Sequence, residues 1–152
     1  MRIRAVKEAD IEKLEKMIEK IFENEYSDYP EKIINIQKQR YKKDELAKKI
    51  KRYDCWIGEV NGEVVGLICL DGDIIKNHFV SLEHRNKGYG SGLVDFVESE
   101  AKKRGLRYLL IYSAPHLATF YQNLGFEEVK EVELNVRGVE TKFVLMEKRL
   151  AT

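Results

Sequence analysis

The spacing of apolar residues changes several times along the chain, and each change marks an expected element. Residues 2–6 alternate between polar and apolar positions, as a short strand does. From Ile11 to Ile21 the apolar residues recur every three or four positions, which predicts an amphipathic helix with Asp10 as its N-cap. After a break in this pattern, residues 31–52 are expected to be helical, as one helix or as two.

In the middle of the chain the period becomes two, which indicates strands. The runs 55–60 and 63–70 flank the dipeptide Asn61-Gly62, which favours a type I′ hairpin turn because both residues tolerate a positive φ. Residues 74–80 form a third alternating run, so we expect a third strand there.

The last part of the chain mixes both periods. An apolar helical face runs from Leu93 to Ala101, and the almost continuously apolar run 106–113 predicts a strand buried on both faces. A short helix over 116–124 and a final hairpin that turns at 135–138 complete the pattern.

The resulting order, β-α-α-β-β-β-α-β-α-β-β, predicts an α/β fold in a single domain over residues 1–152. A helix separates the fourth strand from the fifth, so we expect these two strands to be parallel and the rest of the mixed sheet to be mostly antiparallel. No internal repeat, low-complexity tract or linker interrupts this order.

Composition excludes several classes of protein. The 27 Lys and Arg residues nearly balance the 26 Asp and Glu residues, which argues against a dedicated nucleic-acid-binding protein. No apolar run approaches the ~20 residues of a membrane span, and the amino-terminal segment has no signal-peptide pattern. With three His, two Cys and no CxxC pair, we expect no metal site. Cys55 and Cys69 lie in apolar runs, so we expect buried, reduced thiols and a cytoplasmic location.

The stretch HRNKGYGSGLV, residues 84–94, places glycines at 88, 90 and 92 between a strand and a helix. The first turn of a helix has unpaired N–H groups and the positive end of the helix dipole, and glycines there let a pyrophosphate approach the main chain. Arg85 and Lys87 add positive charge. The stretch is neither a GxxxxGK[ST] P-loop nor a GxGxxG Rossmann loop. Taken alone, it supports a ligand-binding loop and a plain turn equally.

The wider context resembles the GNAT superfamily of acetyl-CoA-dependent N-acetyltransferases. Arg85, Gly88 and Gly90 match the fixed positions of its R/Q-x-x-G-x-G/A signature, and Val80 matches the apolar residue that ends the preceding strand. FYQNLGF, residues 120–126, resembles the second hallmark of the family, an aromatic-Tyr-x-x-x-Gly-Phe segment. The element order agrees as well, so the resemblance covers essentially the whole chain.

The resemblance implies acetyl-CoA as co-substrate, held where strands four and five splay apart. In the family, main-chain N–H groups of the glycine loop bind the pyrophosphate, and the N–H near the end of strand four binds the thioester carbonyl, where it stabilises the oxyanion. The sequence departs from the family at Ala114, where many members have an asparagine that bonds the pantetheine, and offers only Ser113 or main chain instead. The expected cofactor-binding residues are Val80, Arg85, Asn86, Lys87, Gly88, Tyr89, Gly90 and Ser91.

Acetyl transfer needs a neutral amine, so a base must remove one proton and an acid must protonate the departing thiolate. The resemblance implies that Tyr121 is the acid, although its helical spacing also fits a core tyrosine. For the base we keep His78, which alternation puts on the same strand face as Val80, then Asp73, and otherwise a chain of water molecules or a group that the sequence does not identify. A covalent acyl-cysteine would depart from the direct transfer that is usual in the family.

The sequence does not identify the acceptor. In the family the loop between the first two helices and the last hairpin frame the acceptor. Here that loop carries Glu23, Glu25, Asp28 and two tyrosines, which would attract a cationic amine. An ordinary solvated loop is the alternative. The basic segment 38–52 is expected to be a solvated helix face, or else to steer an acidic partner or the nucleotide end of the cofactor.

Three functional hypotheses follow. The favoured one is an N-acetyltransferase for a small cationic amine or a peptide or protein amine, with no nucleic-acid or membrane partner; because dimers are common in the family, a homodimer is also considered. The second is a sensor or regulator that binds acyl-CoA without turnover. The third makes the basic segment a nucleic-acid-binding module, which the net charge of +1 argues against.

Overall fold

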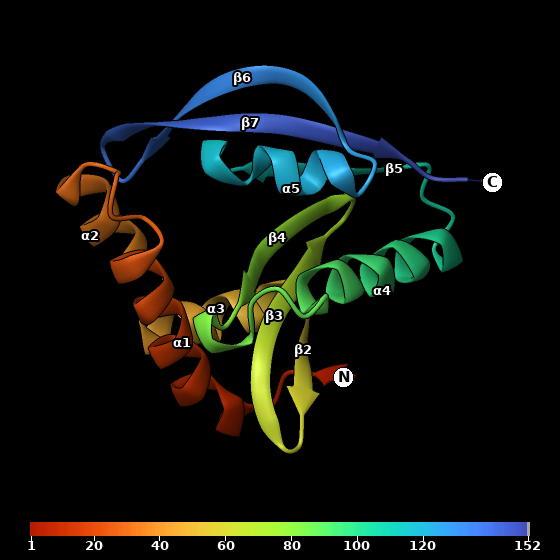
Figure 1. The fold of residues 1–152 in the computed structure, drawn as a ribbon, viewed down its shortest axis with the longest axis horizontal. Coiled ribbons are helices and arrows are strands. Elements are labelled where there is room, and N and C mark those ends of the chain that lie inside the picture. Colours follow the sequence, from red (N-terminus) through yellow and green to blue (C-terminus); the bar gives the residue numbers. More distant parts are fainter. Residues whose placement is uncertain (152) are drawn as a thin grey trace. The chain divides into compact units, whose positions relative to one another are not determined.

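The computed structural model describes residues 1–151 and confirms the α/β fold (Figure 1). In this part of the chain, seven strands form one mixed sheet in the order β1-β2-β3-β4-β5-β7-β6. The strands are β1 (Arg2–Ala5), β2 (Asp54–Val60), β3 (Glu63–Asp71), β4 (Ile74–Val80), β5 (Tyr108–Ser113), β6 (Glu127–Val136) and β7 (Val139–Arg149). The helices are α1 (Ile11–Asn24), α2 (Glu31–Arg40), α3 (Lys43–Arg52), α4 (Tyr89–Lys103) and α5 (Ala118–Asn123).

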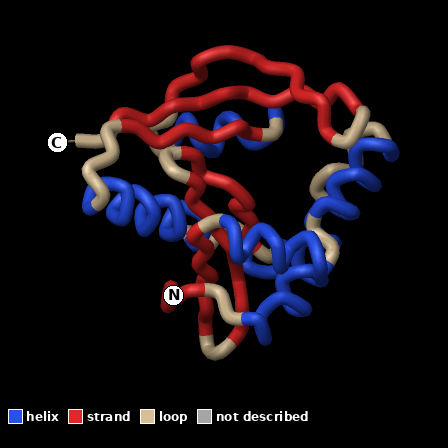
Figure 2. The backbone as a smooth tube through the Cα atoms, turned by 180° about the vertical axis from the view of Figure 1, so that it is seen from behind, coloured by secondary structure: helices blue, strands red, loops and turns tan. Residues whose placement is uncertain are grey.

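The turns form where the sequence predicts them. Asn61 and Gly62 have φ values of 51° and 78°, so the β2–β3 turn has the two left-handed residues that a type I′ turn requires. Arg137 and Gly138, with φ values of 49° and 89°, make the corresponding pair between β6 and β7, the long hairpin visible in Figure 2. The helical segment 31–52 consists of two helices, α2 and α3, which decides between the two expected forms.

The start of α1 differs in detail from the prediction. Asp10 occupies the N-cap position, but its side chain makes no capping bond to α1. Instead its carboxylate accepts hydrogen bonds from the Lys7 main-chain N–H at 2.8 Å and from the guanidinium of Arg4 at 2.9 and 3.0 Å. Asp10 therefore stabilises the turn that leads from β1 into the helix.

The chain forms two compact units. Unit 1 contains Met1–Cys69 and Asn77–Leu93, and unit 2 contains Leu70–Lys76 and the described residues from Val94 onward. Burial of each large apolar side chain contributes roughly 1.5–3 kcal/mol to folding. The fully buried side chains include Leu14, Ile18, Leu46, Ile57 and Leu67 in unit 1, and Val97, Ala101, Leu109 and Met146 in unit 2. The assignment of residues 1–152 to one domain stays a prediction.

The pairing of β4 with β5 within unit 2 confirms the parallel arrangement. Ile74 pairs with Leu110 and Ile75 with Ile111, and the Leu110 N–H donates to the carbonyl of Asp73 at 2.9 Å. Within residues 1–151 this register ends after the second pair. The short pairing agrees with the expected splay of these two strands.

One expectation for β5 was wrong. Its residues alternate between buried and accessible, with Leu109, Ile111 and Ser113 buried but Tyr112 40% exposed. The strand pairs with the antiparallel β7, and one face of this part of the sheet stays accessible, so β5 is buried on one face only. Its apolar run includes aromatic residues that tolerate partial exposure.

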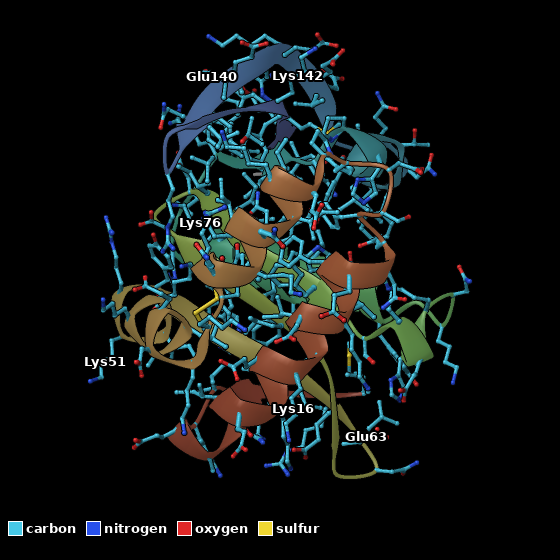
Figure 3. All side chains as sticks on the ribbon, turned by 90° about the vertical axis from the view of Figure 1, so that its left-hand side faces the viewer. Lys16, Lys51, Glu63, Lys76, Glu140 and Lys142 are labelled. Carbon is cyan, nitrogen blue, oxygen red and sulfur yellow. A yellow bond between two sulfur atoms is a disulfide. The ribbon has the colours of Figure 1, made fainter. Side chains whose placement is uncertain are left out.

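The expectation of two reduced thiols was also wrong. Cys55 near the start of β2 and Cys69 near the end of β3 form a disulfide (Figure 3), with their Cα atoms 4.1 Å apart. The hairpin turn brings the two strands together, so residues 14 positions apart in sequence become cross-strand neighbours. Neither residue offers a free thiol for a covalent acyl-cysteine, and cysteine usage no longer supports a reducing compartment. Among the described helices, none is both long enough and apolar enough to span a membrane.

Candidate active site

The glycine stretch forms the start of α4, and two of its glycines, Gly88 and Gly92, have different roles. Gly88 has a φ of 81°, which favours glycine, and helix α4 begins at the next residue. The Gly92 N–H donates to the Gly88 carbonyl at 3.0 Å, which closes the first helical turn. A Cβ at Gly92 would lie 2.9 Å from Cε of Met1, so this glycine serves packing.

The main-chain N–H groups that precede the Gly92–Gly88 hydrogen bond point out of the end of the helix. The N–H groups at the start of an α-helix have no partner within the helix, and here they belong to Tyr89, Gly90 and Ser91. Asn86, Lys87 and Gly88 just before them are exposed, and Asn86 has a φ of 61°. Main-chain donors on half-buried residues at the positive end of a 15-residue helix, just after an exposed lysine, are suited to bind a phosphate group.

Arg85 faces the protein. Its Nε donates to the Val80 carbonyl at 3.0 Å, and its Nη1 and Nη2 donate to the two carboxylate oxygens of Glu25 at 2.7 and 3.4 Å. The sequence suggested that this charge adds to an anion site. The contacts show a side chain that joins three segments of unit 1.

At the end of β4, the main-chain N–H of Val80 points away from β3. The Ser81 N–H donates to the Val65 carbonyl of β3 at 2.8 Å. Successive residues of a strand direct their N–H and C=O groups to opposite edges, so those of Val80 point to the other edge. Arg85 binds this carbonyl, and the neighbouring Val80 N–H lies on the same edge, which is the side on which the sequence predicts a thioester contact.

His78 packs towards the start of α4. Burial lowers the pKa of His78 to about 4, a hydrogen bond to the Gly90 main chain opposes this shift, and the charge of Arg85 adds to it. The residue keeps some exposed surface, but its Nε2 is buried, so the strong desolvation is consistent with the packing of the ring. At neutral pH the imidazole is neutral, and so low a pKa makes it a weak base.

Asn77 lies on the face of β4 opposite to His78, and it is not among the residues expected from the sequence. Its Oδ1 accepts a hydrogen bond from the Tyr41 hydroxyl at 3.0 Å, and the ring of Tyr41 packs on Phe79 and Phe22 with centroids 5.1 and 5.7 Å apart. Asn77 has a φ of 54°, and among the described residues its buried Nδ2 has no hydrogen-bond partner. A left-handed residue inside a strand leaves no trace in hydrophobic periodicity.

The segment 23–30, which includes the end of α1 and the loop after it, is less acidic than its sequence indicates. Glu23 forms an ion pair with Lys38 at 2.8 Å, which lowers the pKa of its carboxyl, and Glu25 is paired with Arg85. Tyr26 is buried, whereas Asp28 is exposed. Two of the three carboxylates expected at an acceptor site are therefore paired within unit 1.

The basic segment over α2 and α3 is also partly neutralised. Besides Lys38, Lys42 pairs with Glu19 at 3.3 Å and Lys48 with Glu45 at 3.2 Å. Lys49 donates to the Arg40 carbonyl at 2.7 Å and lies over the ring of Tyr41. These local contacts favour the solvated helix face over a surface for an acidic partner or a nucleic acid.

An open hollow in unit 1 lies apart from these groups. It has a volume of about 430 Å³ and lies between α1, the β2–β3 turn and residues 81–83. Lys16 and Glu63, both labelled in Figure 3, are among its lining residues. None of the expected site residues lines it.

The predicted acid belongs to unit 2. Tyr121 is 3% exposed and packs against Phe120 and Phe126, with ring centroids 5.0 and 5.9 Å apart. Its carbonyl accepts the N–H groups of Leu124 and Phe126 at 3.0 Å, and Gly125 with a φ of 96° turns the chain between them. The second hallmark segment is thus a tightly closed helix end.

Of the predicted site residues, the structure gathers Val80, His78, Arg85 and the glycine loop in unit 1. Asp73 is exposed and lies in the turn before β4. In unit 2, the Ser113 hydroxyl donates to the Ala114 carbonyl at 2.8 Å, so that the hydroxyl expected near the pantetheine is engaged locally. Within residues 1–151, no group of three or more His, Cys, Asp or Glu side chains is placed to hold a metal ion.

The chain is similar to proteins of known family and to solved structures. The model of the acetyltransferase (GNAT) domain family matches residues 24–150. An uncharacterized N-acetyltransferase of Methanocaldococcus jannaschii is 32% identical over 99 residues, which are 56% of this chain and 44% of that protein, less than half of its length. The crystal structure of a GCN5-related N-acetyltransferase from Rhodopseudomonas palustris has a TM-score of 0.92 at 20% identity, covering 98% of this chain and 95% of the other. PaiA N-acetyltransferase from Thermoplasma acidophilum, solved in complex with coenzyme A, has a TM-score of 0.79 at 20% identity, with 97% and 98% covered.

Proposed function

Because the chain belongs to the acetyltransferase (GNAT) domain family, we propose that it transfers the acetyl group of acetyl-CoA to a primary amine by direct attack. The observation that carries this proposal is the set of main-chain donors on the half-buried residues 89–91 at the start of α4, close in sequence to Arg85, whose side chain binds the Val80 carbonyl. The coenzyme A complex of a structural relative, PaiA, supports the choice of co-substrate.

We assign the diphosphate of the co-substrate to the main chain of residues 86–91. Tyr89, Gly90 and Ser91 would supply N–H donors, and the exposed Lys87 would supply charge. Arg85 contributes by its hydrogen bond to the Val80 carbonyl and not by its charge, because its guanidinium already binds Glu25. This assignment keeps every residue expected from the sequence but changes the role of Arg85 from charge donor to support.

The proposed reaction needs one oxyanion donor, one base and one acid. The amine nitrogen attacks the thioester carbonyl, and the Val80 N–H stabilises the negative charge that forms on the oxygen. Collapse of the tetrahedral intermediate breaks the C–S bond, and Tyr121 protonates the departing thiolate. The proton of the amine leaves through a water chain, because a pKa of about 4 makes His78 a poor acceptor for it.

The acceptor we propose is a small cationic amine or a peptide or protein amine. The exposed Asp28 and the partly exposed ring of Tyr29 support this class, since an anion and a tyrosine ring attract an ammonium group. The pairing of Glu23 and Glu25 reduces the negative charge that such an acceptor would meet. The preference for a cation is accordingly modest.

A second candidate function is a sensor that binds acyl-CoA without turnover. The low pKa of His78 favours it, since His78 is the candidate base within β4 and is then a poor proton acceptor. Release of free thiol from acetyl-CoA, measured over a panel of amines and peptides, tests the two functions. Amine-dependent release supports the enzyme, whereas coenzyme A retained in native mass spectrometry without any release supports the sensor.

A further inference from the structure

The ion pair between Arg85 and Glu25 joins two loops that lie 60 residues apart in sequence. The two guanidinium nitrogens face the two carboxylate oxygens at 2.7 and 3.4 Å, in a fork arrangement. The side chain of Glu25 is 16% exposed and that of Arg85 is 32% exposed, so the pair is partly shielded from solvent. Shielded, charge-assisted forks are stronger and more directional than ordinary surface pairs.

The same guanidinium also fixes the end of β4. Its Nε binds the Val80 carbonyl at 3.0 Å while its two other nitrogens bind Glu25. A lysine could not make these three contacts, because an ammonium group is a point charge and lacks the planar fork. The position of Glu25 is thereby linked to the peptide group that presents the Val80 N–H.

Glu25 in turn belongs to a compact turn at the end of α1. Its N–H donates to the Ile21 carbonyl at 2.8 Å, and the Tyr29 N–H donates to the Tyr26 carbonyl at 2.9 Å. Tyr26 is buried against Phe22, with ring centroids 4.7 Å apart. A shift of Glu25 must therefore displace residues 25–29 together.

We propose that Glu25 is a positioning residue that acts through Arg85 and couples residues 25–29 to the coenzyme A loop, residues 86–91. Occupation of the loop by a diphosphate would hold the segment around Arg85, and the fork would transmit this order to the turn after α1. This inference rests on the proposed function, which places coenzyme A at that loop. By linkage, an acceptor that orders residues 25–29 would then tighten coenzyme A binding by the same factor.

Hydrogen exchange measured by mass spectrometry, with coenzyme A as the probe, tests the coupling. In the wild-type protein, coenzyme A should slow exchange in residues 86–91 and also, by about fivefold, in residues 25–29. In Glu25→Gln the slowing should be confined to residues 86–91. Arg85→Lys, which keeps the charge and removes the fork, should give the same result, and it serves as the test if circular dichroism shows that Glu25→Gln does not fold.

Glu23→Gln is the matched control. It breaks a comparable ion pair, Glu23 with Lys38 at 2.8 Å, in the same part of the chain without touching Arg85, and it should behave as the wild type does. If this control also loses the slowing in residues 25–29, or if Glu25→Gln keeps it, the coupling is overturned. Slowing in residues 86–91 alone in the wild type overturns the coupling and leaves the proposed function standing, whereas no slowing at residues 86–91 overturns the cofactor site itself.

Discussion

The imidazole of His78 is hydrogen-bonded to the main chain of Gly90, the second residue of α4. Since this contact raises the pKa of the histidine, the main-chain partner must be an acceptor, which is the Gly90 carbonyl. The contact links β4 to the first turn of the helix whose N–H groups we assign to coenzyme A. We therefore expect His78 to position this turn without taking part in proton transfer.

His78 should make the stability of the protein depend on pH. Burial lowers the pKa of His78 from 6.5 to about 4, so between these values the unfolded chain binds more protons than the folded one. The free energy of unfolding should then fall by about 3 kcal/mol as the pH drops from 6.5 to 4. Urea unfolding at several pH values measures this slope, which should be shallower in His78→Gln.

The exposed His116 provides the control for this experiment. His116→Gln, measured over the same pH range, is the matched histidine substitution at an exposed position. Equal slopes for the wild type and His78→Gln would contradict the inferred burial of the His78 ring.

Tyr121→Phe separates a general acid from a core tyrosine. If Tyr121 protonates the thiolate, kcat should fall by about 100-fold while the affinity for coenzyme A stays unchanged, because only the transition state loses an interaction. Free-thiol release and calorimetry with coenzyme A measure the two quantities. Tyr112→Phe, at an exposed tyrosine of the same unit, should change neither, and an unchanged kcat in Tyr121→Phe would remove the hydroxyl from the mechanism.

The sequence predicts the elements well and the side-chain contacts poorly. The Asn61-Gly62 turn and the start of α4 follow from signals that act over a few residues, and the parallel β4 and β5 follow from the helix between them. The fork between Glu25 and Arg85 depends on how α1 packs, and no local pattern encodes that packing. Periodicity also does not reveal that Asn77, inside β4, has a left-handed backbone conformation with a φ of 54°.

For the two cysteines, the sequence predicts burial but not the disulfide between them. Their apolar surroundings correctly predict burial, with Cys55 8% and Cys69 1% exposed. Disulfide formation depends on which residues lie opposite each other across the hairpin, and apolar periodicity alone does not set that register. The sequence therefore predicts that the two cysteines are buried, and only the structure shows that they are bonded to each other.

Asp10→Asn should destabilise unit 1. Asp10 is buried and accepts three hydrogen bonds, two from Arg4 and one from the Lys7 main chain, and the bonds from Arg4 are the main cause of its lowered pKa. Loss of the charge should lower the free energy of unfolding by about 2 kcal/mol, because a neutral amide binds the Arg4 guanidinium less strongly than a carboxylate does. Arg4 keeps Glu59 as a partner, which limits the loss. Chemical denaturation at pH 7 measures the loss.

The pH dependence of the same group provides a second measurement. A lowered carboxyl pKa stabilises the fold above the unfolded value of 3.8, and this stabilisation should be lost as the pH falls through the folded pKa. Asp10→Asn should lack this part of the acid transition. Glu12→Gln, at an exposed carboxylate 4.0 Å from Lys16, should stay within about 0.5 kcal/mol of the wild type, and an equal effect of both variants would contradict the special role of Asp10.

Removal of the Cys55–Cys69 disulfide should destabilise the β2–β3 hairpin. The bond closes a loop with a sequence separation of 14, and restriction of the unfolded chain over such a loop stabilises the fold by about 3 kcal/mol. The double variant Cys55→Ala, Cys69→Ala should therefore unfold at lower urea concentration, and wild-type protein reduced with dithiothreitol should do the same. Thiol titration of the denatured, unreduced protein should find no reactive thiol before reduction and two afterwards, whereas two thiols in freshly purified, unreduced protein would contradict the disulfide and restore the expectation of reduced cysteines.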